Sequence, residues 1–318
     1  MKYFIVASIV FILPLSAQDS SVRTTTSVDV NGNRIADGPQ LDQTVSKNFV
    51  ETTERMQSIN GRMVPMERVE ERVVRDDASG RVVERLIYRF DATGNPTTPV
   101  KETIEEQKRP DGSSTIQTTR YQGDVNGDMQ LLQKTTTDTH KSGSTETSST
   151  VVQRPWNGSI ETVEKKEIVR VNDGKNYREE DNTYRRDGNG GFAVAVRQTK
   201  EHSEQGGQTT DNTAEYEIGA EGNLQLHGQT VAKTITEPDG SKESVVNLYG
   251  LNVPGTVDPD GKLKLFEQQI IDQTPRPGNK VVETLSVRRP TVSDPNSLGP
   301  TQQISETVCK GKCGTPAQ

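Results

Sequence analysis

Hydrophobic and polar residues alternate in short stretches along most of the chain. The alternation is plain at 192–196, 224–226 and 262–265, and between such stretches the sequence is rich in Thr, Val, Ile and Tyr. A period of two with many β-branched residues predicts β-strands, whereas helices of this length would favour Ala and Leu. The pattern therefore predicts an all-β protein.

Glycine marks the ends of these stretches at regular intervals. One series recurs about every 32 residues, and a second series lies midway between its members, so each unit has two turns and two connecting segments. Turns of the first series place Asp three residues before Gly, as in Asp91–Gly94, Asp124–Gly127 and Asp187–Gly190. Asp accepts hydrogen bonds from the backbone two residues on, and Gly takes a left-handed conformation. The repeat unit is therefore predicted to be a β-hairpin.

Composition limits how these hairpins can pack. Hydrophobic residues make up only 29% of the chain, and charges occupy both alternating positions of stretches such as 161–167. Such a chain has too little apolar material for a thick two-layer core. We therefore expect an elongated antiparallel β-meander, mostly a single-layer twisted sheet that is either open or curled back on itself. The predicted parts are a divergent opening unit or cap (18–61), the hairpin repeat domain (62–288) and a Pro-rich, flexible tail (289–318).

The first residues look like an export signal. A Lys follows Met1, residues 3–15 are almost wholly apolar, and Ser16 and Ala17 are small. This order is typical of a secretory signal peptide, here 1–17, cut after Ala17. The mature protein is expected to be secreted, periplasmic or on the cell surface, with no transmembrane segment left after cleavage.

A Tyr precedes the turn Gly by six residues in five of the units. In the predicted meander these residues form a ladder along one sheet face, which either covers neighbouring strands or binds sugars or peptides. Tyr-x-x-Asp-x-x-Gly also resembles the YD repeat of Rhs-type shells; it departs at two positions and has a longer period, so no function is transferred. The five residues are Tyr88, Tyr121, Tyr184, Tyr216 and Tyr249.

Two Asp-rich turns have the alternating oxygen ligands that open a calcium loop. The first contains Asp29, Asn31, Asn33 and Asp37, and the second runs from Asp124 to Asp128, where it resembles dockerin and EF-hand loops. Both lack the Gly and the bidentate Glu that such loops need at positions six and twelve. Turn formation explains both without metal, so the first is only a weak metal candidate.

Chemistry elsewhere in the chain is sparse. Cys309 and Cys313 are the two cysteines, and in an exported chain they either form a small disulfide loop, stay free or bond between molecules. The three His are far apart in sequence, and His140 and His202 both precede second-series turns. No nucleophile elbow, zinc-binding His pair or phosphate loop is present. We therefore expect no catalytic residues, no cofactor and no enzymatic activity.

The net charge of −7 without a basic aromatic patch argues against nucleic acid as a partner. The sequence favours a non-enzymatic exported repeat protein that acts as a structural spacer or interaction scaffold, with an envelope or extracellular protein or polysaccharide as its partner. A carbohydrate- or envelope-binding module that uses the Tyr ladder is the alternative. An outer-membrane barrel would need apolar bands facing lipid, which stretches such as 135–140 and 145–150 do not provide.

Overall fold

The structure is a computed structural model. It describes residues 20–29, 33–35, 40–47, 50–91, 93–124, 128–219, 221–251, 262–291, 294 and 297–311. Within these ranges no helix has the length and hydrophobicity needed to cross a lipid bilayer. The predicted signal peptide lies outside the described residues.

Eighteen strands make up a single sheet. They are β1 (Ser20–Ser27), β2 (Gln40–Lys47), β3 (Val50–Ile59), β4 (Arg62–Asp77), β5 (Gly80–Arg89), β6 (Val100–Lys108), β7 (Ser114–Gly123), β8 (Met129–Ser142), β9 (Thr145–Trp156), β10 (Ser159–Asp173), β11 (Asn176–Arg186), β12 (Phe192–Gln205), β13 (Gln208–Ile218), β14 (Leu224–Thr236), β15 (Lys242–Gly250), β16 (Lys264–Arg276), β17 (Lys280–Arg288) and β18 (Gln302–Lys310).

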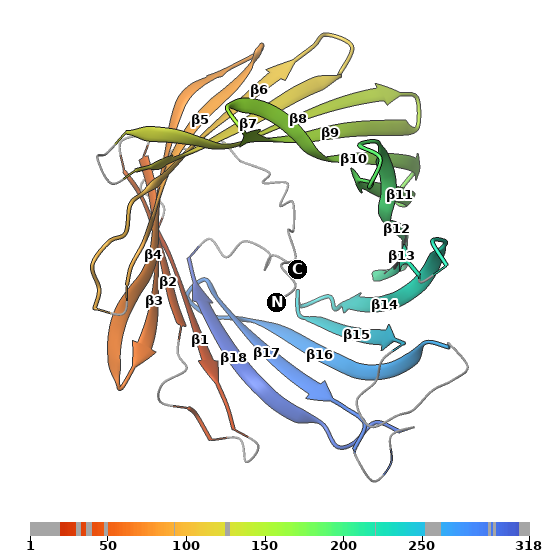
Figure 1. Cartoon of the computed structure of the whole chain (residues 1–318). Helices are drawn as coiled ribbons and strands as arrows, with labels where there is room; N and C mark the ends of the chain where they lie inside the picture. The colour runs from red at the N-terminus through yellow and green to blue at the C-terminus, as the bar shows by residue number, and fades with distance from the viewer. Residues whose placement is uncertain are drawn as a thin grey trace.

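The sheet closes on itself. Each strand pairs antiparallel with its neighbours in sequence, and β1 pairs with both β2 and β18, from Val22 opposite Lys310 to Ser27 opposite Ser305. The strands therefore form a ring, which Figure 1 shows in a view along its axis. The predicted all-β meander of hairpins is confirmed, but the predicted elongated sheet is wrong, and of the open and curled-back arrangements that the sequence allowed the sheet adopts a fully closed one. Closure joins segments from opposite ends of the chain, for which local patterning carries no signal.

The two rims of the barrel differ in their connections. At one rim, called the loop rim, long connections cover 28–39, 90–99, 251–263 and 289–301, although β3–β4 and β9–β10 are joined there by tight turns. At the other, called the turn rim, most connections are two or three residues long, and β1 begins and β18 ends there. The barrel is thus polarised along its axis.

At the turns within the described residues, the glycine conformations and the Asp hydrogen bonds agree with the sequence prediction. Gly94, Gly190 and Gly222 have φ values of 85°, 81° and 78°. Asp91 Oδ1 accepts hydrogen bonds from the Thr93 N–H at 2.9 Å and the Thr93 hydroxyl at 2.6 Å. Gly127, the equivalent glycine of the Asp124 turn, lies outside the described residues.

Bulges recur at the repeated Tyr. The ladder register shifts immediately before Tyr121, Tyr184, Tyr216 and Tyr249, where the following strand contains one extra residue. A bulge bends its strand and increases the local twist. The repeat therefore supplies curvature at the same height of successive hairpins, which favours closure.

The predicted domain divisions do not interrupt the sheet. The boundary at 61/62 falls in the turn between β3 and β4, and these strands are paired throughout. The segment predicted as a flexible tail contains β18, which pairs with β17 and β1. This segment was predicted to be a tail because prolines flank it. Residues 302–310 nevertheless alternate as a strand does, with Ile304 and Val308 between polar residues.

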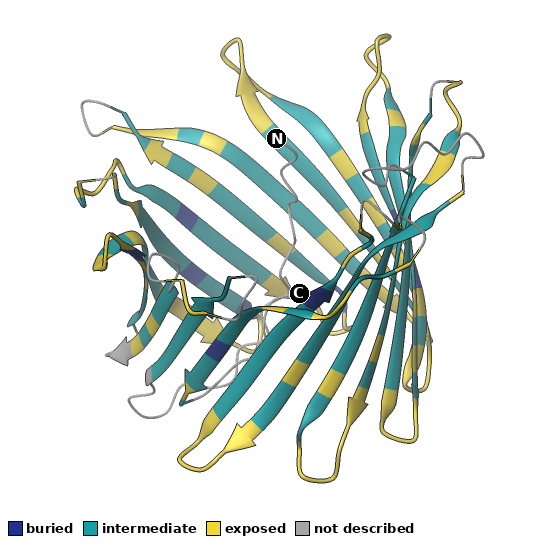
Figure 2. Ribbon diagram, turned by 90° about the horizontal axis from the view of Figure 1, so that it is seen from below, coloured by how far each residue is buried: buried dark blue, intermediate teal, exposed yellow. Residues whose placement is uncertain are grey.

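Apolar packing contributes little to holding the barrel together. Among the described residues, the buried hydrophobic side chains are Val83 and Val287, at 4% and 2% exposure. Most strand residues are half-buried, and exposed residues gather at the ends of the strands (Figure 2). The backbone ladders and the side-chain pairs across them must therefore supply most of the stability.

Gly80→Ala should destabilise the barrel. Gly80 has φ 151°, and a Cβ atom there would lie 1.9 Å from the carbonyl oxygen of Glu106 on the neighbouring strand. Relief requires the β5–β6 ladder to shift, at a cost of about 1–3 kcal/mol. Gly188→Ala is the control, since its Cβ would meet nothing within 4 Å. Urea unfolding followed by circular dichroism measures both, and equal midpoints would contradict the close approach.

Acid should weaken the turns. Hydrogen bonds from the Ser79 hydroxyl and N–H lower the pKa of Asp77, and equivalent bonds from Ser113 and Ser241 lower the pKa values of Asp111 and Asp239. A carboxylate with a lowered pKa stabilises the folded state above its unfolded pKa, near 3.8, and this stabilisation is lost as pH falls through the folded pKa.

We expect the urea midpoint to drop as the pH is lowered below about 4. In a variant with Asp77→Asn, Asp111→Asn and Asp239→Asn the drop should be smaller. A pH dependence identical to that of the wild type would show that these turns contribute nothing.

Candidate functional site

The ladders assign every paired strand residue to one of two faces of the wall. Directly opposed residues of an antiparallel pair share a face, and neighbours along a strand alternate. Glu102 is opposite Arg85 on β5 and Arg120 on β7, so these three residues share a face. The same rule, applied from strand to strand, assigns one consistent face around the ring. Val83, Glu179, Asp181, Val287 and Thr307 lie on the same face, and all are buried.

This is the inner face of the barrel. Side chains converge inside a closed wall and diverge outside it, so burial identifies the inner face. Among the described strand residues, Ser58, close to the loop rim, is the buried side chain that lies on the outer face. The candidate functional site is accordingly the inner wall.

A chain of alternating charges crosses the inner wall from β4 to β7. Arg85 Nε lies 2.6 Å from Glu71 Oε2, and its Nη1 lies 3.3 Å from Glu102 Oε2. Arg120 Nε lies 2.6 Å from the other oxygen of Glu102. The Glu102 side chain is only 4% exposed and is held between two guanidinium groups. Such bonds between ionised groups are stronger than those between neutral ones.

A second charged cluster lies on the inner wall between β10 and β12. Glu179 Oε2 accepts a hydrogen bond from Arg170 Nε at 2.8 Å, and its Oε1 accepts one from Lys200 at 3.0 Å. Beside it, Lys166 lies 2.7 Å from buried Asp181. The cluster resembles the first in holding one buried carboxylate between two cations.

An aromatic stack extends this cluster towards the turn rim. The Tyr177 and His202 rings lie 4.9 Å apart and nearly parallel, and the Arg170 guanidinium lies 4.4 Å from the Tyr177 ring. His202 Nδ1 is 2.6 Å from Asp211 Oδ1. The four side chains therefore form a continuous ordered strip over β10 to β13.

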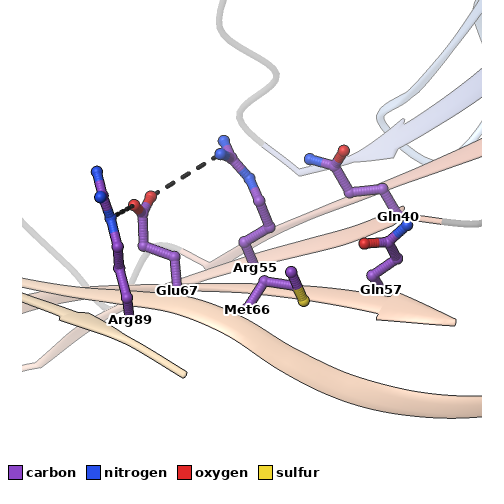
Figure 3. Close-up of a pocket in the computed structure, with 6 residues that line it drawn as sticks. All are labelled: Gln40, Arg55, Gln57, Met66, Glu67 and Arg89. Carbon is purple, nitrogen blue, oxygen red and sulfur yellow. Dashed lines mark ion pairs between the residues drawn. The ribbon is translucent and has the colours of Figure 1, made fainter. Parts of the chain in front are cut away.

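Near the loop rim the inner wall carries a shallow groove of about 290 Å³. Arg55 and Arg89 each lie 3.8 Å from Glu67, and Gln40, Gln57 and Met66 complete the lining. Figure 3 shows these side chains on one side of the strands, with Glu67 between the two guanidinium groups. The groove continues the polar chemistry of the inner wall.

Between the charged clusters, uncharged hydroxyl groups line part of the inner wall. Thr137 and Thr150 bond at 2.8 Å, and Thr139 and Ser148 bond at 2.9 Å. The inner wall is therefore wettable over these strands as well as over the clusters.

All five repeated Tyr lie on the outer face. Tyr121 follows inward-facing Arg120 and Tyr88 follows inward-facing Ile87, and the registers of Tyr184, Tyr216 and Tyr249 give the same result. They lie near the loop rim and do not face the barrel interior. The predicted single-face ladder thus describes their placement, while the glycan-binding module is overturned by closure into a barrel.

The outer wall carries charges over most of its height. Glu84 pairs with Lys101 at 3.1 Å, and Arg178 pairs with Glu201 at 3.4 Å. Membrane-spanning barrels expose an apolar band of about 25 Å, and an Arg or Lys in the middle of that band costs about 2–4 kcal/mol. On β8 the outward-facing residues of 135–140 are Thr136, Asp138 and His140, which are polar as the sequence indicated. The rejection of a barrel on this ground is nevertheless wrong, because the sheet closes into a ring.

Of the remaining predicted site residues, Asp29 and Asn33 lie together in one turn. Asn33 donates from its N–H and its side chain to Asp29 at 2.8 and 3.1 Å, while Asn31 and Asp37 lie outside the described residues. No group of three His, Cys, Asp or Glu side chains suited to a metal occurs in the part of the chain that is described. Cys309 is disulfide-bonded, and Cys313, the other cysteine, lies outside the described residues.

The two His near the turn rim do not share a face. His140 projects outward from β8, and His202 projects inward from β12. Sequence reasoning passed over Glu102, Glu179 and Tyr177, because a charged residue at an alternating strand position looks the same whichever face is enclosed. Closure alone gives these residues their special environment.

Comparison with solved structures shows similarity in fold. A porin variant from Rh. blastica matches with a TM-score of 0.51 and 7% identity, over 92% of this chain and 98% of the porin chain. CdiB from Acinetobacter baumannii matches with a TM-score of 0.38 and 10% identity, over 92% of this chain and 59% of that chain. No protein-family model matches the sequence, and the comparison with curated proteins gives no match.

The closed, porin-like barrel corrects the functional prediction from the sequence. A structural spacer or scaffold was expected because a regular sheet supplies reach and its edges or Tyr face supply contacts. The pairing of β1 with β18 removes those edges and encloses a space instead. The prediction of a spacer is therefore wrong.

Glu102→Gln should destabilise the barrel more than the matched outer change Glu84→Gln. The inner substitution leaves Arg85 and Arg120 without their shared negative charge, at a cost of about 1.5–3 kcal/mol. Glu84 pairs with Lys101 on the exposed wall, where such a pair contributes less than about 1 kcal/mol. Urea unfolding measures the difference, and equal losses would contradict the distinction between the two faces.

Proposed function

We propose that the protein is a channel of the cell envelope, in which the barrel encloses a water-filled passage for hydrophilic molecules. The observation that carries this proposal is the closed ring of 18 strands with a charged inner wall. Barrels with this number of strands are wider than their side chains can fill, so an aqueous space remains along the axis.

The difference in connection length between the two rims of the barrel supports the same function. Long connections gather at one rim and tight turns at the other, an arrangement that known envelope barrels share. The similarity to a porin variant supports the fold on which the proposal depends. The predicted signal peptide would deliver the chain to the envelope.

The inner wall suits passage better than tight binding or catalysis. Its buried carboxylates Glu102 and Glu179 are held by neighbouring cations and make a rigid, hydrated lining. The role proposed is non-enzymatic, and small or extended hydrophilic solutes are the molecules that such a lining would pass.

A matched pair of cysteine substitutions tests the passage. Ser148 faces inward and Ser149 faces outward on β9, and Ser→Cys changes little in size. Cys309 is disulfide-bonded and does not compete for a thiol reagent. A bulky maleimide attached to Ser148→Cys should narrow the passage, whereas the same adduct on Ser149→Cys should not.

Uptake of a charged, membrane-impermeant dye by cells that make each variant is the measurement. We expect several-fold slower uptake with the Ser148→Cys adduct and wild-type uptake with the Ser149→Cys adduct. If neither adduct alters uptake although both thiols are labelled, passage through the barrel is refuted. Equal slowing by both adducts would also refute it, because only one of them faces the interior.

A further inference from the structure

Three carboxylates follow one another along the inner face of β13. Asp211, Glu215 and Glu217 occupy alternating, inward-facing positions of this strand, and all three are half-buried. From the first to the third, the strand rises by about 20 Å, at about 3.3 Å per residue. We call these three residues the acidic track. The track leads from near the turn rim towards the loop rim, on the side of the ring formed by β11 to β14 (Figure 1).

Other acidic lines of the inner wall adjoin basic ones. Glu67, Glu71 and Asp76 of β4 are each directly opposite an Arg of β5. Glu179 of β11 has a cation directly opposite it on both neighbouring strands. Opposite charges that face each other in this way largely cancel a short distance from the wall, so a solute passing these strands meets little net field.

The acidic track has no such basic neighbours. Neither ladder of β13 places a Lys or Arg directly opposite one of its carboxylates, and the inward-facing residues of β14 from Gly228 to Thr236 are all uncharged. The opposed residues are Val196, Gln198 and His202 on β12, and Gln225, Gly228 and Ala232 on β14.

Side-chain contacts give the same picture of the track. His202 lies 2.6 Å from Asp211, and His227 lies 3.8 Å from Glu217, but neither His is a permanent cation. Within the described part of the chain, no ion pair or hydrogen bond engages the Glu215 side chain. The track is therefore a line of negative charge that the protein itself leaves uncompensated.

A buried oxygen beside the track points to a ligand. Asp181 faces the interior from β11, is 7% exposed, and has its Oδ2 atom 2.7 Å from Lys166. Its Oδ1 atom is buried and accepts no hydrogen bond within the described ranges. Buried polar atoms nearly always have a partner, so this oxygen calls for a donor.

Gln198 connects this oxygen to the track. It is directly opposite Asp181 in one ladder and Glu215 in the other, so the three side chains form a row across β11, β12 and β13. Among the described residues, no hydrogen bond holds the Gln198 side chain in place. It can therefore move aside for a donor that enters from the interior, and its amide oxygen adds a further acceptor.

A cationic N–H group suits this row better than a metal ion does. Calcium and magnesium take six or more oxygen ligands, and the described residues contain no group of three His, Cys, Asp or Glu suited to a metal. Ammonium and guanidinium groups form strong, charge-assisted hydrogen bonds with one or two carboxylates. Lys166 shows this chemistry within the protein, since its ammonium group binds the other oxygen of Asp181.

We propose that the acidic track, with Asp181 and Gln198 beside it, binds the ammonium or guanidinium groups of solutes that enter the barrel. Binding is weak and reversible, because the carboxylates are partly hydrated and lie at successive heights of the wall. The passage then favours cationic solutes over anionic ones. This consequence rests on the proposed function, whereas binding to the track can be measured without passage.

Calorimetric titration of the purified full mature chain at low salt tests the binding. The probe is diaminobutane, which carries two ammonium groups at neutral pH. Butanediol has the same length without charge, and tetramethylammonium has charge without N–H donors. We expect diaminobutane to bind, tetramethylammonium to bind at least about fivefold more weakly, and butanediol not to bind. Absence of diaminobutane binding, or equal binding of diaminobutane and butanediol, would overturn the proposal.

A matched pair of substitutions locates the site. Glu215→Gln removes an inward-facing carboxylate, and Glu243→Gln removes an exposed one from the outer face of β15. Neither glutamate has an ion pair within the described ranges, so both variants keep the existing contacts. We expect about fivefold weaker diaminobutane binding for Glu215→Gln and wild-type binding for Glu243→Gln. Equal affinities of the two variants would contradict the assignment to the inner wall.

Gln198→Lys tests the site without removing a carboxylate. The new ammonium group lies directly opposite Asp181 and Glu215 and supplies the cation that the track lacks. Opposite charges that face each other across strands stabilise a sheet, so the urea midpoint should not fall. Diaminobutane binding should nevertheless weaken about fivefold or more. Unchanged binding in this variant would rule out the row as the site.

Conductance across a planar lipid bilayer separates the binding site from the passage. Diaminobutane should reduce the current through the wild-type barrel, and Glu215→Gln should relieve this block. A barrel that conducts but neither binds diaminobutane nor is blocked by it would refute the site and leave the passage intact. A barrel that binds diaminobutane but does not conduct would support the site and refute the passage.

Discussion

The ladder between β1 and β18 is the constraint on which the rest of the structure depends. It joins Val22–Ser27 to Ser305–Lys310, and it is reinforced by the Thr25–Thr307 hydroxyl pair at 3.0 Å and by Arg34 to Glu306 at 3.1 Å. Without it, the first and last strands would expose rows of backbone donors and acceptors to any other strand. With it, one face of the sheet becomes an interior and the other becomes a wall.

Closure also explains how a chain with so few apolar residues can fold. A sandwich must bury one face of each sheet in a hydrophobic core, but a ring satisfies its backbone by pairing alone. The charges that would disturb a sandwich can then pair across strands, as Glu71, Arg85, Glu102 and Arg120 do. The resulting stability depends on many modest contacts spread along the wall and not on one packed centre.

Local features of the fold could be predicted from the sequence, and closure could not. The hairpin period, the Asp-x-x-Gly turns and the shared face of the five Tyr all follow from the nature and spacing of neighbouring residues. The pairing of Thr25 with Thr307 depends on accumulated twist and bulge over the whole sheet, which no short window records. The prediction of a spacer failed at this point, since an open and a closed meander have the same alternation.

The candidate site was missed for the same reason. Glu102 and Glu105 are both glutamates on β6, yet Glu102 is buried between two arginines and Glu105 lies on the outer face. Their sequence surroundings do not separate them, because a wall that is polar on both faces has no hydrophobic marker of its interior. Only the strand register shows that the guanidinium groups of Arg85 and Arg120 lie beside Glu102.

The repeated Tyr links the curvature of the wall to its surroundings. Tyr121, Tyr184, Tyr216 and Tyr249 each follow a register shift, so each marks the place where a hairpin bends. A feature present once per hairpin returns at the same height all along the sheet. In the closed sheet, these Tyr side chains lie at one height on the outer face of β7, β11, β13 and β15. The same repeat that curves the barrel therefore places the Tyr side chains at one height, whereas hairpins without a common bulge position would place them at different heights.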